Sequence, residues 1–295
     1  MEHVKEESSI NGSINQFPVV GIGASAGGLD AFKSFIKAIP DNCGMAFILV
    51  QHLHADHASS LPEILQRETS IPVQEISDRV TVQPNTIYVI PSNKMLVASD
   101  GILELSPRPE KGQPNNVIDV FFSSLAEVHQ SRSIGIILSG TGSDGTAGLK
   151  QIKDQGGITF AQEVAGAEFG AMPQSAIDQD VADFVANPEK MPEQLMRLNQ
   201  ALHVPVIAGT ESSVNSSEEE SFKQILTVLR TRKGMDFTYY KQTTIRRRIL
   251  RRLALINKES VKEYMEFLHQ NNPEQDILFQ DMLIPVTTFF RDTKS

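Results

Sequence analysis

The sequence predicts an α/β fold: a doubly wound, mostly parallel sheet with a β-hairpin insertion, followed by a small all-α domain. From Phe17 to about Gln200, short apolar runs alternate with segments of helical spacing. Two runs, 45–50 and 134–138, are almost continuously apolar, which is typical of parallel strands covered on both faces. Beyond a serine-rich stretch, only helical patterns remain. Strands and helices in alternation favour right-handed crossovers in the first domain.

Composition and length set the outer limits. The 295 residues suffice for one large and one small domain, and the net charge of −9 argues against a nucleic-acid binder. A single cysteine, Cys43, excludes an intrachain disulfide, and no apolar run reaches membrane-spanning length, so we expect a cytoplasmic protein. We predict a flexible N-terminus at 1–16, an α/β domain at 17–204, a linker at 205–220 and a helical domain at 221–291.

The elements of the α/β domain can be assigned in order. The helix 29–36 ends before Pro40, and the helix 60–67 tolerates Pro62 in its first turn. Between Val73 and Leu105 the pattern changes to short β-rich pieces, with a hairpin through Ser99-Asp100-Gly101. The expected series is strand 19–22, helix 29–36, strand 45–50, helix 60–67, strand 86–90, the hairpin, helix 118–128, strand 134–138, helix 145–155, strand 158–161 and helix 192–201.

Three predicted strands end in residues that can carry chemistry. Ser25 follows the first strand in a glycine-rich turn, His52 follows the second, and Asp144 lies in the glycine-rich loop after 134–138. Sites in open α/β sheets form at the carboxyl ends of the strands, so these side chains can converge. We predict a serine nucleophile, a histidine base and an aspartate that orients the imidazole.

The turns around these residues can supply an oxyanion site. Amides at a helix start favour negative charge, so we expect Ala26 and Gly27, with Thr141 from the second glycine-rich loop, to line the active site. Each feature also has a simpler interpretation. Ser25 can belong to a tight strand-to-helix turn, Asp144 can cap a helix, and His52 can be a partly buried structural histidine.

Two other interpretations use the same residues. Gly21-x-Gly23-x-x-Ala26 fits a loose dinucleotide fingerprint, but no acidic residue ends the next strand. The stretch His52-x-His54-x-Asp56-His57 resembles the metal-binding motif of metallo-β-lactamase-fold hydrolases, which makes a zinc hydrolase a less favoured alternative. The chain order Ser, His, Asp also differs from that of α/β-hydrolases.

Several motifs in order resemble the catalytic domain of the chemotaxis protein-glutamate methylesterase family, CheB. They are Gly23–Gly28, Val50-Gln51-His52, Ile87–Pro91, Ile118–Phe122, Gly140–Gly148, Ala161-Gln162 and Gly170-x-Met172-Pro173. The resemblance implies hydrolysis of glutamate γ-methyl esters on the cytoplasmic helices of chemoreceptors, with glutamine deamidation as a side activity. The family's triad falls on Ser25, His52 and Asp144, and no cofactor or metal is implied for the esterase.

Residues 222–295 resemble the N-terminal helical domain of the methyltransferase family CheR. The resemblance lies in Lys241, the segment Arg246–Arg252 and the closing segment Pro285–Arg291. It implies that Thr287 and Arg291 contribute to S-adenosylmethionine binding in a full-length methyltransferase. The methyltransferase catalytic domain is absent from this sequence, so we expect the front part of a CheB–CheR fusion without methyl transfer.

The sequence departs from the CheB pattern in two places. The lead-in is too short for the usual receiver domain, so direct control by phosphorylation is not expected. Pro114–Val117 stands where the family shows a His-Arg-Pro-Ser-like segment, which affects substrate docking more than bond chemistry. This change allows a different class of function, a non-catalytic receptor-binding or regulatory module.

A basic helix in the second domain gives a further expectation. We expect its arginines to dock on acidic receptor helices, with a solvated, salt-bridged helix face as the alternative. The residues concerned are Arg246, Arg247, Arg248, Arg251 and Arg252. Contact with the membrane would then be indirect, through the receptor.

Overall fold

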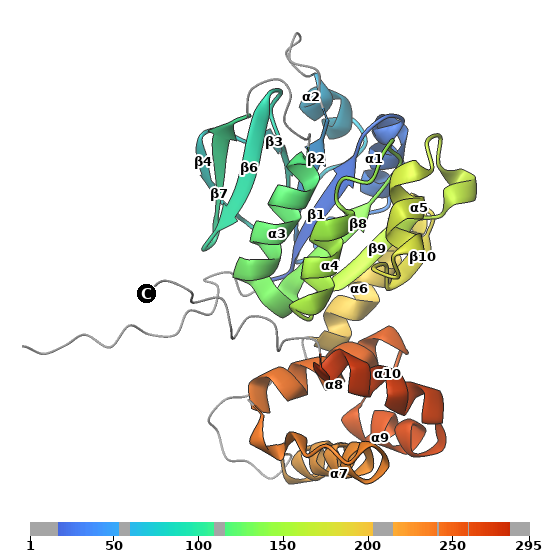
Figure 1. Ribbon diagram of the computed structural model, residues 1–295. Helices are drawn as coiled ribbons and strands as arrows, with labels where there is room; N and C mark the ends of the chain where they lie inside the picture. The colour runs from blue at the N-terminus through green and yellow to red at the C-terminus, as the bar shows by residue number, and fades with distance from the viewer. Residues whose placement is uncertain are drawn as a thin grey trace, which may run out of the picture.

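A computed structural model describes residues 17–52, 60–108, 116–202, 215–240, 242–258 and 260–283. These residues form a seven-stranded sheet in which the paired strands are parallel. In spatial order its strands are β10 (Phe184–Ala186), β9 (Ile158–Gln162), β8 (Ser133–Ile137), β1 (Val19–Ala24), β2 (Ala46–Gln51), β5 (Thr86–Val89) and β3 (Val73–Glu75). The predicted fold class is confirmed, with β1 at the centre of the sheet (Figure 1).

A small antiparallel sheet makes up the predicted insertion. It contains β4 (Arg79–Thr81), β7 (Ile102–Pro107) and β6 (Lys94–Ser99). Strands β6 and β7 pair from Lys94↔Pro107 to Ser99↔Ile102, so the hairpin through Asp100 and Gly101 forms where it was predicted. Leu96 and Leu103 from this hairpin join the apolar core beside the large sheet.

Helices cover both faces of the large sheet. One face is covered by α1 (Gly28–Lys37), α2 (Leu61–Gln66) and α6 (Met191–Leu202), and the other by α3 (Val117–His129), α4 (Thr146–Asp154) and α5 (Ala171–Asp178). Side chains alternate between the faces along each strand, as the pleat requires. Val20 and Ile22 of β1 therefore belong to the core on the α1 face, whereas Val19 belongs to the core on the α3 face.

The two glycines of β1 allow α3 to approach the sheet closely. A Cβ added at Gly21 would lie 2.9 Å from the Phe121 and Phe122 rings, and one added at Gly23 would lie 2.5 Å from Ile118. No real Cβ atom packs at such distances, so only glycine fits here. The close approach brings the start of α3 to the carboxyl edge of the sheet, where the candidate site lies.

The second domain is a bundle of helices. It comprises α7 (Asn215–Lys233), α8 (Gln242–Leu255), α9 (Val261–Gln270) and α10 (Asn272–Leu283). Phe222, Ile225 and Leu229 share the buried face predicted for them and pack with Tyr264 and other apolar side chains. Ser260 caps α9 by accepting a hydrogen bond from the Glu263 amide at 3.1 Å.

The helical domain lies at the amino edge of the sheet, on the side away from α2 (Figure 1). Helix α7 begins at Asn215, so residues 215–220 of the predicted linker are helical. No helix within the described part of the chain combines the length and the apolar character needed to cross a membrane.

Candidate active site

The site residues predicted from strand ends follow three neighbouring strands, β1, β2 and β8. β1 pairs with β2 on one side and with β8 on the other. Its last pair with β2 is Ala24↔Gln51, so Ser25 and His52 are the next residues of the two strands. Adjacent strands run about 4.8 Å apart, which places both residues at the same part of the carboxyl edge.

His52 and Asp144 are in direct contact. His52 Nε2 lies 2.7 Å from Asp144 Oδ2, and the two side chains are only 15% and 8% exposed. The residues are 92 positions apart in the chain. The contact engages Nε2 and leaves Nδ1 as the ring nitrogen that can exchange a proton with another group.

The start of α3 fixes the Asp144 carboxylate. Oδ2 also accepts the Ile118 amide hydrogen at 2.9 Å, and Oδ1 accepts that of Asp119 at 3.0 Å. The first amides of a helix are unpaired within the helix and favour an anion. Asp144 is therefore held by the backbone of α3 as well as by the imidazole.

Asp119 joins α3 to the loop that carries Asp144. Its Oδ1 accepts the Gly148 amide hydrogen at 2.8 Å, which ties the first turn of α4 to α3. Burial, with a further contribution from the charge of Asp144, raises the pKa of Asp119. Reasoning from strand ends missed this residue, although it lies within the quoted motif Ile118–Phe122.

The Ser25 turn is fixed by backbone hydrogen bonds. The Ser25 amide donates to the Ser139 carbonyl at 3.0 Å, and the Ser25 carbonyl accepts from the Gly28 amide at 3.0 Å and from Gln51 Nε2 at 3.3 Å. Gly27 has a φ of 70°, which a side chain would strain. Among the described residues, none accepts a hydrogen bond from the Ala26 or Gly27 amide.

Two further side chains that were not predicted support this turn. The Ser139 hydroxyl donates to the Ala26 carbonyl at 2.9 Å and accepts the Phe169 amide hydrogen at 3.0 Å. Gln162, which is 3% exposed, accepts the Ser139 amide hydrogen at 2.8 Å. Each bond joins two segments distant in sequence, so no local pattern could indicate it.

Three more residues lie around the site. Thr141 is exposed in the loop between β8 and α4. Burial lowers the pKa of Arg108, while the charge of Asp144 acts in the opposite direction. Glu168 lies over the Ser25 turn, because a Cβ added at Gly27 would meet its Oε2 at 2.8 Å.

Residues 20–195 match the family model described as CheB methylesterase, which covers more than half of the chain. The chain belongs to the CheB methylesterase family. It is therefore assigned to a family of carboxylic ester hydrolases. Residues 220–283 match a second family model, the all-alpha domain of CheR methyltransferase.

Individual relatives agree with the family assignment. A Leptospira interrogans protein named putative protein-glutamate methylesterase/protein-glutamine glutaminase is 34% identical over 185 residues, or 62% of this chain and 96% of that protein. An uncharacterized 104.1 kDa protein of Rhodobacter capsulatus is 30% identical over 254 residues, which are 80% of this chain but only 27% of that protein. The crystal structure of the Thermotoga maritima CheB methylesterase catalytic domain matches with a TM-score of 0.58 and 30% identity, over 62% of this chain and 100% of that one.

The geometry of the CheB-type domain bears on the two alternative interpretations. Gly21 and Gly23 face the side chains of α3, so their role is close packing and not a cradle for a dinucleotide. His54, Asp56 and His57 of the metal-motif interpretation lie outside the described residues. Within the part of the chain that the structure describes, no group of three His, Cys, Asp or Glu side chains is arranged to hold a metal ion.

Other predicted residues are placed only in part. Asn116 immediately precedes α3, and Val117 is buried, whereas Pro114 and Asn115 lie outside the described residues. Thr287 and Arg291 of the CheR-type closing segment also lie outside them.

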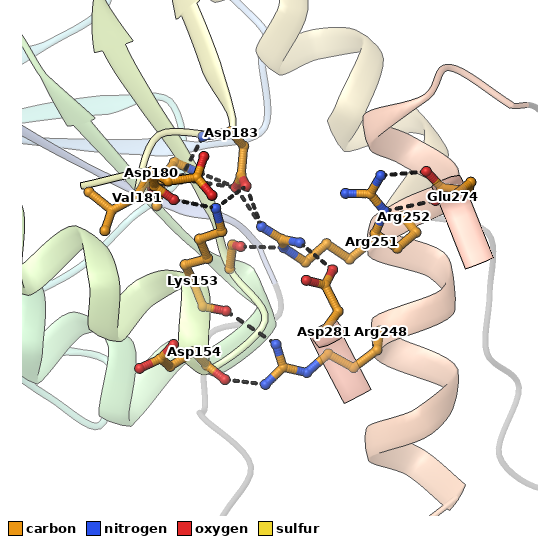
Figure 2. Close-up of polar contacts among 12 residues, drawn as sticks. Lys153, Asp154, Asp180, Val181, Asp183, Arg248, Arg251, Arg252, Glu274 and Asp281 are labelled. Carbon is orange, nitrogen blue, oxygen red and sulfur yellow. Dashed lines mark hydrogen bonds and ion pairs between the residues drawn. The ribbon is translucent and has the colours of Figure 1, made fainter. Parts of the chain in front are cut away.

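The prediction that the basic helix docks on a receptor is wrong for Arg248 and Arg251. Both are 1% exposed, because α8 packs against the CheB-type domain (Figure 2). Burial, followed by the charges of Arg247 and Arg251, lowers the pKa of Arg248 to about 10. Arg247 is half-buried and donates to Gln130 Oε1 at 2.8 Å.

The remaining two arginines bind within the helical domain. Arg246 pairs with Glu219 and lies over the Phe222 ring, 4.5 Å from its centroid. Arg252 binds both carboxylate oxygens of Glu274, at 2.9 and 2.7 Å. The sequence correctly predicted a charged helix. It did not show that the arginines of this helix bind partners within the same protein.

Proposed function

We propose that the chain hydrolyses glutamate γ-methyl esters on chemoreceptors, with Ser25 as nucleophile, His52 as general base and Asp144 as its orienting carboxylate. The observation that carries this proposal is the 2.7 Å contact between His52 and Asp144, together with the position of His52 after β2, the strand that pairs with the one preceding Ser25. Family membership supplies the reaction class. The contact between His52 and Asp144 supports the roles proposed for these residues.

The proton transfers follow from the contacts of the imidazole. Asp144 holds Nε2–H, so Nδ1 would take the Ser25 proton as Oγ attacks the ester carbonyl. The imidazolium formed then faces a carboxylate that is only 8% exposed. Nδ1–H would next protonate the departing methoxide, releasing methanol and leaving an acyl-enzyme.

The tetrahedral oxyanion needs donors that are already in place. The Ala26 and Gly27 amides, at the start of α1, are suited to this role, and Thr141, exposed in the loop between β8 and α4, is a further candidate donor. Water activated by His52 would then attack the acyl-enzyme and release glutamate. Glutamine deamidation would follow the same tetrahedral path, with ammonia as the leaving group.

The proposed substrate defines the surroundings in which the protein acts. Its partners would be the cytoplasmic helices of methyl-accepting receptors, so the protein would be cytoplasmic and would approach the membrane only through the receptor. Every proton transfer above is assigned to a side chain of this protein. We therefore propose that the esterase needs no metal or organic cofactor.

A substitution at the nucleophile tests the proposal. Ser25→Ala is expected to abolish methanol release from methylated receptor, while its circular dichroism and unfolding midpoint stay close to those of the unchanged protein. Ser106→Ala, an exposed serine of the small sheet, serves as the matched control. Full activity of the Ser25→Ala variant would contradict the assignment, and inhibition by a chelator would favour the zinc alternative.

A labelling experiment separates catalysis from the non-catalytic alternative. An active-site serine probe should modify Ser25 and no other serine, and the label should disappear in the Ser25→Ala variant. No labelling of a folded protein would support a receptor-binding module that has lost its nucleophile.

A further inference from the structure

The contact between the two domains lies at the amino edge of the sheet, opposite the candidate active site (Figure 1). There α8 faces the loop between α4 and β9 and the start of β10. Ala254, near the end of α8, packs in the apolar core that α6 shares with the CheB-type domain. Apolar packing and polar contacts therefore adjoin along one helix.

Arg248 binds the carboxyl end of α4. Its Nη1 donates to the Lys153 carbonyl at 3.2 Å, and its Nη2 donates to the Asp154 carbonyl. The last carbonyls of a helix carry partial negative charge, so a buried guanidinium is favoured there, although the Lys153 carbonyl also accepts from the Gly156 amide at 3.0 Å. Among the described residues, Arg248 Nε has no hydrogen-bond partner.

Arg251 connects the two domains more extensively. Its Nη2 lies 2.6 Å from both carboxylate oxygens of Asp183, and its Nε donates to the Gly157 carbonyl at 2.9 Å. Its Nη1 donates to Asp281 of the helical domain at 2.9 Å. One buried cation thus binds a carboxylate from each domain, as Figure 2 shows.

The CheB-type domain holds Asp183 in place by its own contacts. Asp183 Oδ2 accepts from the Thr159 amide at 3.1 Å, the Thr159 hydroxyl accepts from the Asp183 amide at 3.0 Å and donates to the Val181 carbonyl at 2.6 Å, and Lys153 Nζ lies 3.6 Å from Oδ1. The carboxylate is therefore positioned without help from α8. A preorganised acceptor reduces the entropy lost on binding a guanidinium.

The adjoining loop fits the same helix closely. Gly156 has a φ of 83°, and a Cβ added there would lie 3.1 Å from Arg247 Nε. A side chain at this position would both strain the backbone and press on α8. The loop thus allows α8 to reach the Gly157 carbonyl.

We propose that the amino edge of the CheB-type domain is a dedicated binding site for the helical domain, anchored by the guanidinium groups of Arg248 and Arg251. Its occupant is residues 215–283 of the same chain, and the site holds them without the connecting segment. Arg251 is the stronger anchor, because two of its three partners are carboxylates and all three of its donor nitrogens are paired, whereas Arg248 binds neutral carbonyls.

Cleavage of the full chain tests this proposal. A recognition sequence for a site-specific protease is inserted between residues 205 and 213, and the folded protein is cut and passed over a size-exclusion column at low micromolar concentration. The two halves of the otherwise unchanged protein should elute together. Arg251→Ala and Asp183→Asn should each weaken the association by about 30-fold or more, since each removes the buried ion pair that joins the two domains.

Arg246→Ala is the matched control, because it removes an arginine of the same helix whose partners among the described residues, Glu219 and Phe222, belong to the helical domain. Its halves should stay together, and Arg248→Ala should weaken them less than Arg251→Ala. Circular dichroism establishes that each variant is folded, and scattering of the uncut variants should give a larger radius of gyration for Arg251→Ala and Asp183→Asn. Separation of the unsubstituted halves, or full retention in both of these variants, would overturn the proposal.

Discussion

The substitution Asp144→Asn removes the charge opposite the imidazole while changing little else. The amide oxygen of Asn can take the position of Oδ2 and accept from His52 Nε2 and from the Ile118 amide. Its NH2 group would then face the Asp119 amide, which loses its acceptor. The opposite orientation would place the NH2 group against two donors, His52 Nε2–H and the Ile118 amide, so the first orientation is favoured.

The expected loss follows from the charge that is removed. A carboxylate and an imidazolium with charge centres about 4 Å apart, at an effective dielectric constant of about 20, attract by about 4 kcal/mol. Since each 1.36 kcal/mol corresponds to a factor of ten in rate, Asp144→Asn should lower kcat by about a thousandfold. The unpaired Asp119 amide should cost roughly 1–3 kcal/mol of folding stability.

Methanol release from methylated receptor measures the rate, and urea unfolding measures the stability separately. Asp119→Asn is the control, because it removes a neighbouring carboxylate whose amide replacement can still accept from Gly148, while Asp144 stays in contact with His52. Its activity should stay within roughly tenfold of the unchanged protein. If folded Asp144→Asn retained more than a tenth of the activity, the role assigned to this carboxylate would be refuted.

Three further predictions follow from other parts of the structure. Burial lowers the pKa of His129 from an ordinary 6.5 to about 4 in the folded protein. As the pH falls below 6.5, His129 is therefore protonated in the unfolded chain before it is protonated in the folded one. Up to roughly 3 kcal/mol of folding stability should be lost between pH 6.5 and pH 4. His129→Gln should flatten that part of the stability profile, and an unchanged slope would count against the burial argument. Gly23→Ala, whose Cβ would lie 2.5 Å from Ile118, should lower stability by about 1–3 kcal/mol in urea unfolding and also reduce activity, since the Ile118 amide helps to hold the Asp144 carboxylate. Glu168→Gln should raise kcat/KM roughly twofold to fivefold at low salt, with less effect at high salt, by removing an exposed negative charge near the proposed oxyanion. Glu127→Gln, at the far end of α3, should change nothing, and equal effects of the two substitutions would contradict this account.

Much of the fold could be predicted because the core pattern is local. Continuous apolar runs marked β2 and β8, and helical spacing marked α1, α3 and α4. The shorter elements α5 and β10 were not predicted, since brief segments carry little periodic signal. The placement of helices on both faces then followed from alternation and crossover handedness.

The candidate site was predictable to the extent that strand ends determine it. Ser25, His52 and Asp144 each follow a strand, and parallel neighbours bring such residues to one edge. The structure brings His52 and Asp144 into contact, while their catalytic roles stay predictions. The supporting bonds of Asp119 and Ser139 were not predictable, because each depends on which distant backbone group lies beside the side chain.

The arginine helix shows why charge patterns alone mislead. A run of arginines usually indicates a solvated face or a surface for acidic partners. Here the acceptors for Arg248 are the carbonyls of Lys153 and Asp154, and one acceptor for Arg251 is the Gly157 carbonyl. Backbone carbonyls have no sequence signature, so the pattern of α8 could not distinguish an external partner from the neighbouring domain. The features that identify the neighbouring domain as the partner of α8 lie in the CheB-type domain itself. There a glycine-rich loop and a preorganised Asp183 form an acceptor site for a buried guanidinium.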